Sequence, residues 1–111
     1  MAYLNWQEKI DEELTHAQIA RSLGNEGKAR VCARRAAGIA IGVYINKNHL
    51  QDPGQSVIDR LNYLHSLPNI SSATRQSIEY LTQRVNEDYK LPKDVDLIEE
   101  AQKLITTLLT D

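Results

Sequence analysis

The chain lacks the features that would place it in an oxidising compartment, in a membrane or on a polyanion. It has one cysteine, Cys32, so no disulfide can form within the chain. Its longest uncharged apolar run, residues 36–45, is far shorter than the roughly 20 residues that span a bilayer. The first residues lack the basic and then apolar layout of a signal peptide. The net charge is −2, so any binding of an anion must come from a local patch. We expect a cytoplasmic protein with no membrane partner.

Signals for β-structure are missing as well. No stretch alternates polar and apolar residues with a period of two, and no Asn-Gly or Asp-Gly pair predicts a hairpin. A length of 111 residues, 41% of them apolar, suits one domain with one core. We therefore predict a single all-α domain over residues 1–111, an up-down bundle of about five helices.

The first two predicted helices are the longest. Apolar side chains recur every three or four positions over about residues 5–23, which predicts a helix with one buried face. Gly24 suits the position that follows a helix C-terminus, and the short turn after it sends a second helix, about residues 26–46, back antiparallel to the first.

The uncharged second half of that helix, residues 36–45, indicates a position at the centre of the bundle. Gly38 and Gly42 form a Gly-x-x-x-Gly step within it. Such a step is typical of dimerising helices in membranes. In this chain it predicts that a neighbouring helix crosses close to the backbone.

The third predicted helix starts at Asp52 as N-cap, with Pro53 at its first position, and ends at Pro68.

Two more helices follow. Ser71 or Ser72 caps the fourth helix, whose apolar face extends to Val85. Asp94 or Asp96 caps the fifth, a leucine-rich amphipathic helix.

A basic cluster begins the second helix and is the strongest candidate binding site. It consists of Lys28, Arg30, Arg34 and Arg35, with Arg21 just across the turn. Arg30 and Arg34 share one helix face, whereas Lys28 and Arg35 share another. Their density beside a helix N-terminus predicts binding of a phosphate, an RNA backbone or an acidic protein partner. The alternative is a solvated face that pairs with acidic residues of the same chain.

Other reactive side chains lack the partners that chemistry requires. Glu13 and His16 form one Glu-x-x-His step, but di-metal bundles need two, so we expect no metal and no cofactor. Cys32 lies among small helix residues and is predicted to be a packed thiol rather than a nucleophile.

The order of these features resembles the HEPN (higher eukaryote and prokaryote nucleotide-binding) superfamily. The resemblance lies in the plan: a first helix, the turn at residues 24–27, a long small-residue helix that contains residues 33–40, an Asp-Pro-capped third helix, a fourth that ends in Tyr89, and a leucine-rich last helix. It implies a frequently dimeric helical bundle. Members act as RNases, as nucleotide-associated modules, or as partners of minimal nucleotidyltransferases in toxin–antitoxin pairs.

The RNase motif of that superfamily, Arg-x(4–6)-His, has one match here, from Arg60 to His65. The match lies within the predicted third helix, where residues five apart point about 140° away from each other. That geometry argues against catalysis unless the helix breaks near His65.

Taken together, these patterns favour a non-catalytic binding or assembly module that forms a homodimer. Its candidate ligands are the phosphate of a nucleotide or RNA and an acidic protein partner, bound by Lys28, Arg30, Arg34 and Arg35. One alternative is a metal-independent, toxin-type ribonuclease that uses Arg60 and His65 as catalytic residues. Another is a purely structural homo-oligomeric protein.

Overall fold

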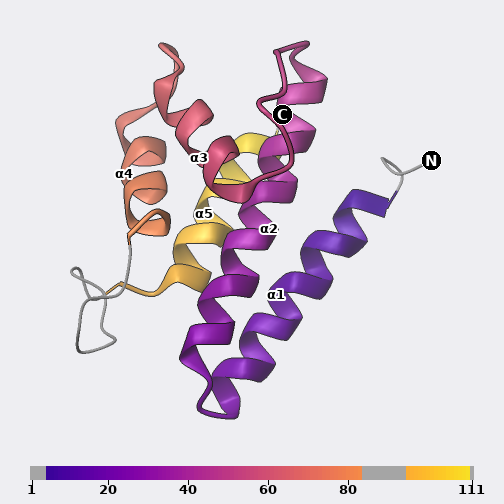
Figure 1. The fold of residues 1–111 in the computed structure, drawn as a ribbon, viewed down its shortest axis with the longest axis vertical. Coiled ribbons are helices and arrows are strands. Elements are labelled where there is room, and N and C mark those ends of the chain that lie inside the picture. The colour runs from indigo at the N-terminus through magenta and orange to yellow at the C-terminus, as the bar shows by residue number, and fades with distance from the viewer. Residues whose placement is uncertain (1–4, 84–94, 111) are drawn as a thin grey trace.

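The computed structural model describes residues 5–83 and 95–110, and within these ranges it contains five α-helices and no β-strand (Figure 1). The predicted all-α class and the number of helices are confirmed. None of the helices in the described part of the chain combines the length and the apolar character needed to cross a membrane. The helices are α1 (Trp6–Ser22), α2 (Glu26–Lys47), α3 (Val57–Ser66), α4 (Ser72–Leu81) and α5 (Leu97–Leu109).

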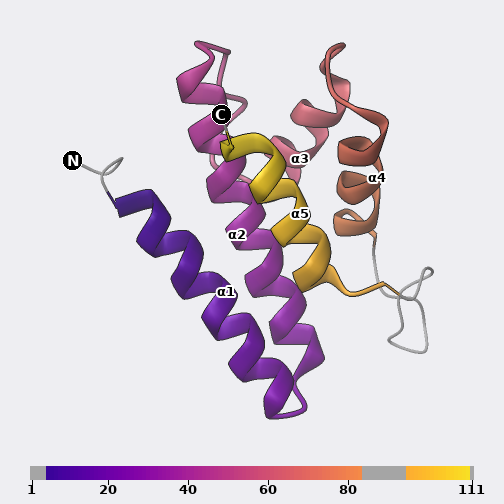
Figure 2. The same ribbon diagram turned by 180° about the vertical axis from the view of Figure 1, so that it is seen from behind.

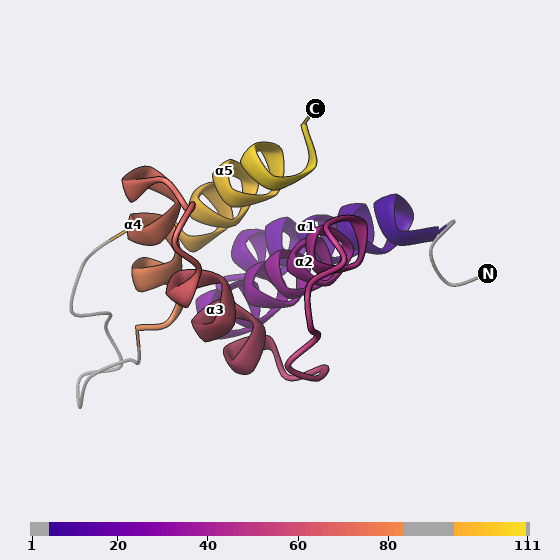
Figure 3. The same ribbon diagram turned by 90° about the horizontal axis from the view of Figure 1, so that it is seen from above.

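The central element is α2, which packs against α1, α3 and α5. Figures 1 and 2 show α2 between α1 on one side and the other three helices on the other. Seen from above, α3 and α4 lie on the side of α2 away from the start of α1 (Figure 3). Within residues 36–45, Ala37 and Ile41 are fully buried and Ile45 is 2% exposed, so the predicted central position of this stretch is confirmed.

The core has two parts. A small cluster joins α1 to α2 through Ile10, Ala36 and Ala40. The larger cluster joins α2 to the other helices, and its largest side chains are Ile41, Ile45, Leu61, Leu64, Ile78, Leu81, Leu97, Ile98 and Leu104.

The two interior glycines of α2 lie where α3 crosses it. A Cβ atom on Gly38 would lie 3.0 Å from Cγ2 of Val57, and one on Gly42 would lie 2.6 Å from Nη1 of Arg60. Arg60 donates hydrogen bonds to the carbonyl oxygens of Gly38 and Gly54, at 3.1 and 2.9 Å. The prediction that a neighbouring helix crosses close to this Gly-x-x-x-Gly step is confirmed.

The turn between α1 and α2 follows the predicted chemistry. Gly24 adopts a φ of 78°, which favours glycine after a helix C-terminus. Asn25 then caps α2, because its side-chain oxygen accepts a hydrogen bond from the backbone N–H of Lys28. The antiparallel hairpin of α1 and α2 follows from this short connection.

The start of α3 was predicted wrongly. The helix begins at Val57 and is capped by Ser56, not by Asp52 with Pro53 at the first position. The side chain of Asp52 instead accepts a hydrogen bond from the backbone N–H of Gly54, whose φ is 116°. A residue with this backbone conformation cannot belong to a right-handed helix, so the helix starts after it.

The N-cap of α4 was predicted correctly, but the length of the helix was not. Ser71 Oγ accepts a hydrogen bond from the backbone N–H of Thr74, at 3.1 Å. The helix ends at Leu81, before the predicted continuation toward Val85, which lies outside the described residues. The carbonyl of Leu81 accepts a hydrogen bond from Arg34 of α2 and so needs no further helical turn.

The cap of α5 is Asp96, one of the two predicted candidates. Its Oδ1 accepts hydrogen bonds from the backbone N–H groups of Ile98 and Glu99, at 3.0 and 3.2 Å. The other candidate, Asp94, lies outside the described residues, as does Tyr89.

Candidate binding surfaces

Some cations of the basic cluster at the start of α2 bond to other residues of the chain, and others do not. Arg21, at the end of α1, is paired within the chain, because its guanidinium lies 2.8 Å from Glu26 and 3.0 Å from Asp96. These two hydrogen bonds raise the pKa of Arg21 above its ordinary value, and Arg21 in turn lowers the pKa of both carboxyl groups. Arg21 thus ties the α1–α2 turn to the start of α5.

Arg34 also forms hydrogen bonds within the chain. Its Nε and Nη2 donate to the carbonyl oxygens of Leu81 and Gln83, at 2.8 and 2.9 Å. These carbonyls stand at and just beyond the C-terminus of α4, where oxygen atoms lack helical partners. Burial lowers the pKa of Arg34, and the nearby positive charge of Arg30 adds to that effect. Two of the Arg34 donors are therefore occupied within the molecule.

The remaining cations of the cluster face solvent. Within the described residues, none of Lys28, Arg30 and Arg35 forms an ion pair, while Arg30 is half-buried and the other two are exposed. Lys28 and Arg35 share a helix face with Val31, which is 42% exposed. We call Lys28, Val31 and Arg35 the α2 basic face.

A complementary face lies on α1. Glu8, Glu12 and Ile19 follow helical spacing along one side of this helix, and all three are exposed. Ile19 is 50% exposed, and neither glutamate makes an ion pair with any described residue. We call these three residues the α1 acidic face.

The candidate metal residues lie on α1 and the candidate thiol lies on α2. Glu13 is half-buried and His16 is exposed, and in residues 5–83 and 95–110 no group of three or more His, Cys, Asp or Glu side chains is placed to hold a metal ion. Cys32 is 2% exposed, so its predicted packing in the core is confirmed. Burial raises the pKa of the Cys32 thiol, and the Glu13 carboxylate raises it further.

The two residues of the RNase-like motif contact different elements. The Arg60 guanidinium lies against the backbone of α2 and against the loop before α3, where it also reaches Asp52 at 3.4 Å. His65 Nε2 lies 3.0 Å from Oε2 of Glu79 on α4. Because the partners lie on different sides of α3, each side chain is held by its own neighbours rather than by a shared cleft.

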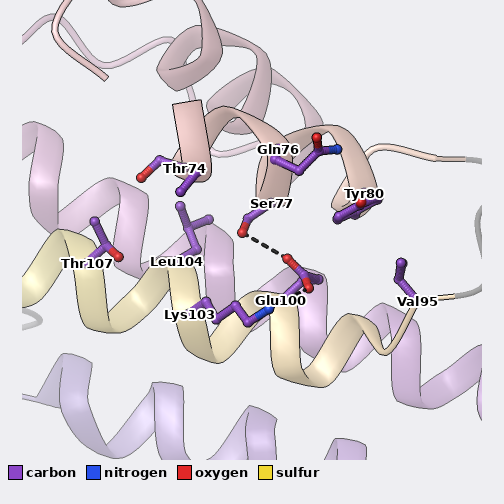
Figure 4. Close-up of a pocket in the computed structure, with 10 residues that line it drawn as sticks. Thr74, Gln76, Ser77, Tyr80, Val95, Glu100, Lys103, Leu104 and Thr107 are labelled. Carbon is purple, nitrogen blue, oxygen red and sulfur yellow. Dashed lines mark hydrogen bonds and ion pairs between the residues drawn. The ribbon is translucent and has the colours of Figure 1, made fainter. Parts of the chain in front are cut away.

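A groove between α4 and α5 was not predicted from the sequence. It has a volume of about 540 Å³, and at its floor Ser77 faces Glu100 (Figure 4). A signal for it was present, because Glu100 falls three residues after Leu97 and four before Leu104 on the apolar face of α5. A carboxylate at such a position requires a polar partner from a neighbouring element.

Comparison with protein-family models, with curated proteins and with solved structures finds no match. The resemblance to the HEPN superfamily rests on the five-helix plan alone.

Proposed function

We propose that this chain is a HEPN-like, non-catalytic assembly module that forms a homodimer, with the α2 basic face of one copy on the α1 acidic face of the other. The observation that carries the proposal is the presence of both faces on one helical hairpin, each with charges unpaired within the described residues. A two-fold symmetric interface requires that each copy carry both halves of the contact.

The mixture of charge and apolar area favours a protein partner over a phosphate backbone. Val31 lies between two cations and Ile19 follows two carboxylates, and both apolar side chains are about half exposed. Phosphate recognition relies on cations and N–H donors and gains little from aliphatic side chains. Protein interfaces combine an apolar centre with a polar rim.

The lengths of the two faces are compatible. Val31 and Arg35 are four residues apart, which corresponds to a rise of about 6 Å along α2. Ile19 and Glu12 are seven residues apart, which corresponds to about 10.5 Å along α1. With Val31 against Ile19 of the second copy, the remaining difference of about 4.5 Å is within reach of a flexible arginine side chain.

The ribonuclease alternative has less support from the geometry. Arg60 already donates to two backbone carbonyls and to a carboxylate, so fewer of its five N–H donors remain for a phosphate. Binding of RNA to the α2 basic face remains a separate hypothesis, which the experiment below also tests.

Complementary charge reversal tests the dimer. We expect the wild type to be dimeric by size-exclusion chromatography with light scattering, and Arg35→Glu and Glu12→Lys each to be monomeric. A mixture of the two variants restores both contacts of the interface, one in the native and one in the reversed orientation, so it should form a heterodimer. Gln102→Glu, on the exposed side of α5, is the matched control and should remain dimeric.

Two results would overturn the proposal. One is a wild type that stays monomeric up to about 100 µM, a concentration that corresponds to an association free energy of about 5.5 kcal/mol. The other is a mixture of variants that stays monomeric although each variant is folded by circular dichroism. If single-stranded RNA binds a monomeric wild type and Lys28→Ala and Arg35→Ala abolish that binding, the face belongs to RNA instead.

A further inference from the structure

A buried carboxylate lies in the groove between α4 and α5. Glu100 is 8% exposed and is one of three buried polar residues of the described chain, with Thr74 and Ser77. All three line this groove. Because a buried charge is unfavourable unless it is paired, the contacts of Glu100 indicate what the groove is suited to hold.

Glu100 receives one partner from the protein interior and one from the rim. Ser77 Oγ donates to its Oε1 at 2.9 Å, and Lys103 Nζ donates to its Oε2 at 3.2 Å. A carboxylate offers about four acceptor positions, so further donors can be accommodated. The serine is buried, whereas the Lys103 side chain is 57% exposed and approaches from solvent. The cation that neutralises Glu100 therefore comes from the rim of the groove.

Lys103 has a second carboxylate within reach. Its Nζ lies 3.7 Å from Oε1 of Glu99, which is itself 61% exposed. The lysine can turn from Glu100 to Glu99 and keep an ion pair as it moves. Glu100 would then lack a cation unless another one entered the groove.

The rest of the lining suits a small polar ligand with an aliphatic stem. Thr74, Gln76, Tyr80 and Thr107 add polar groups to the lining farther from the carboxylate, and Leu104 adds an apolar wall (Figure 4). The volume of about 540 Å³ lies within the range of small-ligand pockets.

We propose that this groove binds an alkylammonium group, which displaces Lys103 from Glu100 and takes its place beside Ser77. Lys103 marks the position of the ligand, because its own side chain is a butylammonium group. The site involves α4, α5 and Val95 just before α5, so this inference is independent of the proposed dimer contact between α1 and α2.

The first test compares n-butylamine with its neutral counterpart n-butanol on the wild-type protein. Titrations followed by amide NMR should show saturable shifts of Ser77 and Thr74 with the amine and much smaller shifts with the alcohol. Equal responses to the two compounds would overturn the proposal without any variant. Cadaverine and Nα-acetyl-lysine amide then distinguish a free amine from a peptide-borne lysine as the preferred source of the group.

The second test uses two variants with opposite expected effects. Lys103→Ala removes the internal competitor and should tighten n-butylamine binding by about two- to fivefold, as expected for loss of an exposed ion pair. Glu100→Gln keeps the shape and the acceptor for Ser77 but removes the charge, and should abolish saturable binding. Gln102→Ala, which lies beside Lys103 and does not line the groove, should bind as the wild type does. Unchanged affinity in Lys103→Ala, or binding retained in folded Glu100→Gln, would refute the site.

Discussion

Replacement of Gly42 by alanine tests how α3 is joined to α2. The added Cβ would lie 2.6 Å from Nη1 and 2.9 Å from Cζ of Arg60, so the guanidinium must move. The overlap itself is easily relieved, because the contacted atoms are the far end of a flexible side chain. The larger effect is the loss of the hydrogen bonds from Arg60 to Gly38 and Gly54.

The expected loss of stability follows from these two hydrogen bonds. Hydrogen bonds from a charged group contribute about 1.5–3 kcal/mol each, and the exposed position of the Gly54 carbonyl places them at the lower end. Their loss costs about 3 kcal/mol, and the better helix propensity of alanine recovers about 1 kcal/mol. We expect Gly42→Ala to be destabilised by about 2 kcal/mol, which lowers Tm by about 8 °C in a chain of this length.

The assay is urea unfolding followed by circular dichroism, with two comparisons. Gly27→Ala is the matched control, because a Cβ there would meet only Asn25 Oδ1, at 3.9 Å, and should stabilise the protein slightly. In the background of Arg60→Ala, the change Gly42→Ala should no longer destabilise, since the group that it displaces is gone. A single Gly42→Ala variant as stable as the wild type would refute this account of the α2–α3 contact.

Three further predictions concern the other charged and reactive groups. Arg34→Ala should lower the free energy of unfolding by about 2–3 kcal/mol through the loss of two hydrogen bonds to the end of α4; Arg35→Ala should have little effect, and equal losses in urea titrations would contradict the division of the cluster. Because Arg21 lowers the pKa of Asp96, the Asp96 carboxylate stabilises the folded state at pH values above its unfolded pKa of about 3.8. This contribution is lost as the pH falls below that value through the lower folded pKa. Asp96→Asn should therefore flatten the acid limb of a stability–pH profile, and an unchanged limb would disprove the linkage. Cys32 should react with a disulfide reagent at neutral pH only after denaturant is added, since burial raises its pKa; rapid reaction of the native protein would show that the thiol is accessible.

Most of the fold follows from local sequence signals, and the errors lie where distant residues intervene. The bounds of α1 and α2 agree closely with those predicted from the apolar periodicity and from Gly24. The cap of α5 at Asp96 was predicted from a pattern that spans only four residues. The end of α4 depends on Arg34, which lies 47 residues away in the sequence and could not be detected from the apolar pattern.

The start of α3 shows a different limit. An Asp-Pro pair favours both a helix N-terminus and a turn, and the choice between them depends on the residue that follows. Here Gly54 takes a positive φ and Asp52 caps that turn, so the same two residues lie outside the helix.

The partners of the candidate site residues were harder to predict than the fold, because they lie far away in the sequence. Helical spacing placed Arg30 and Arg34 on one face and Lys28 and Arg35 on another, but it could not show that Arg34 bonds to carbonyls 47 and 49 positions away at the end of α4. The buried pairing of Ser77 with Glu100 joins residues 23 positions apart, so only the unusual place of Glu100 on an apolar face pointed to it.

The central place of α2 has a consequence for how the chain folds. Residues 36–45 are synthesised early, yet the α5 side chains that cover them, such as Leu97 and Leu104, come more than 50 positions later in the sequence. A nascent chain that extends only through α4 exposes part of the buried face of α2 to solvent. Such a chain is a substrate for chaperones and a source of aggregation, and native packing of α2 has to wait for α5.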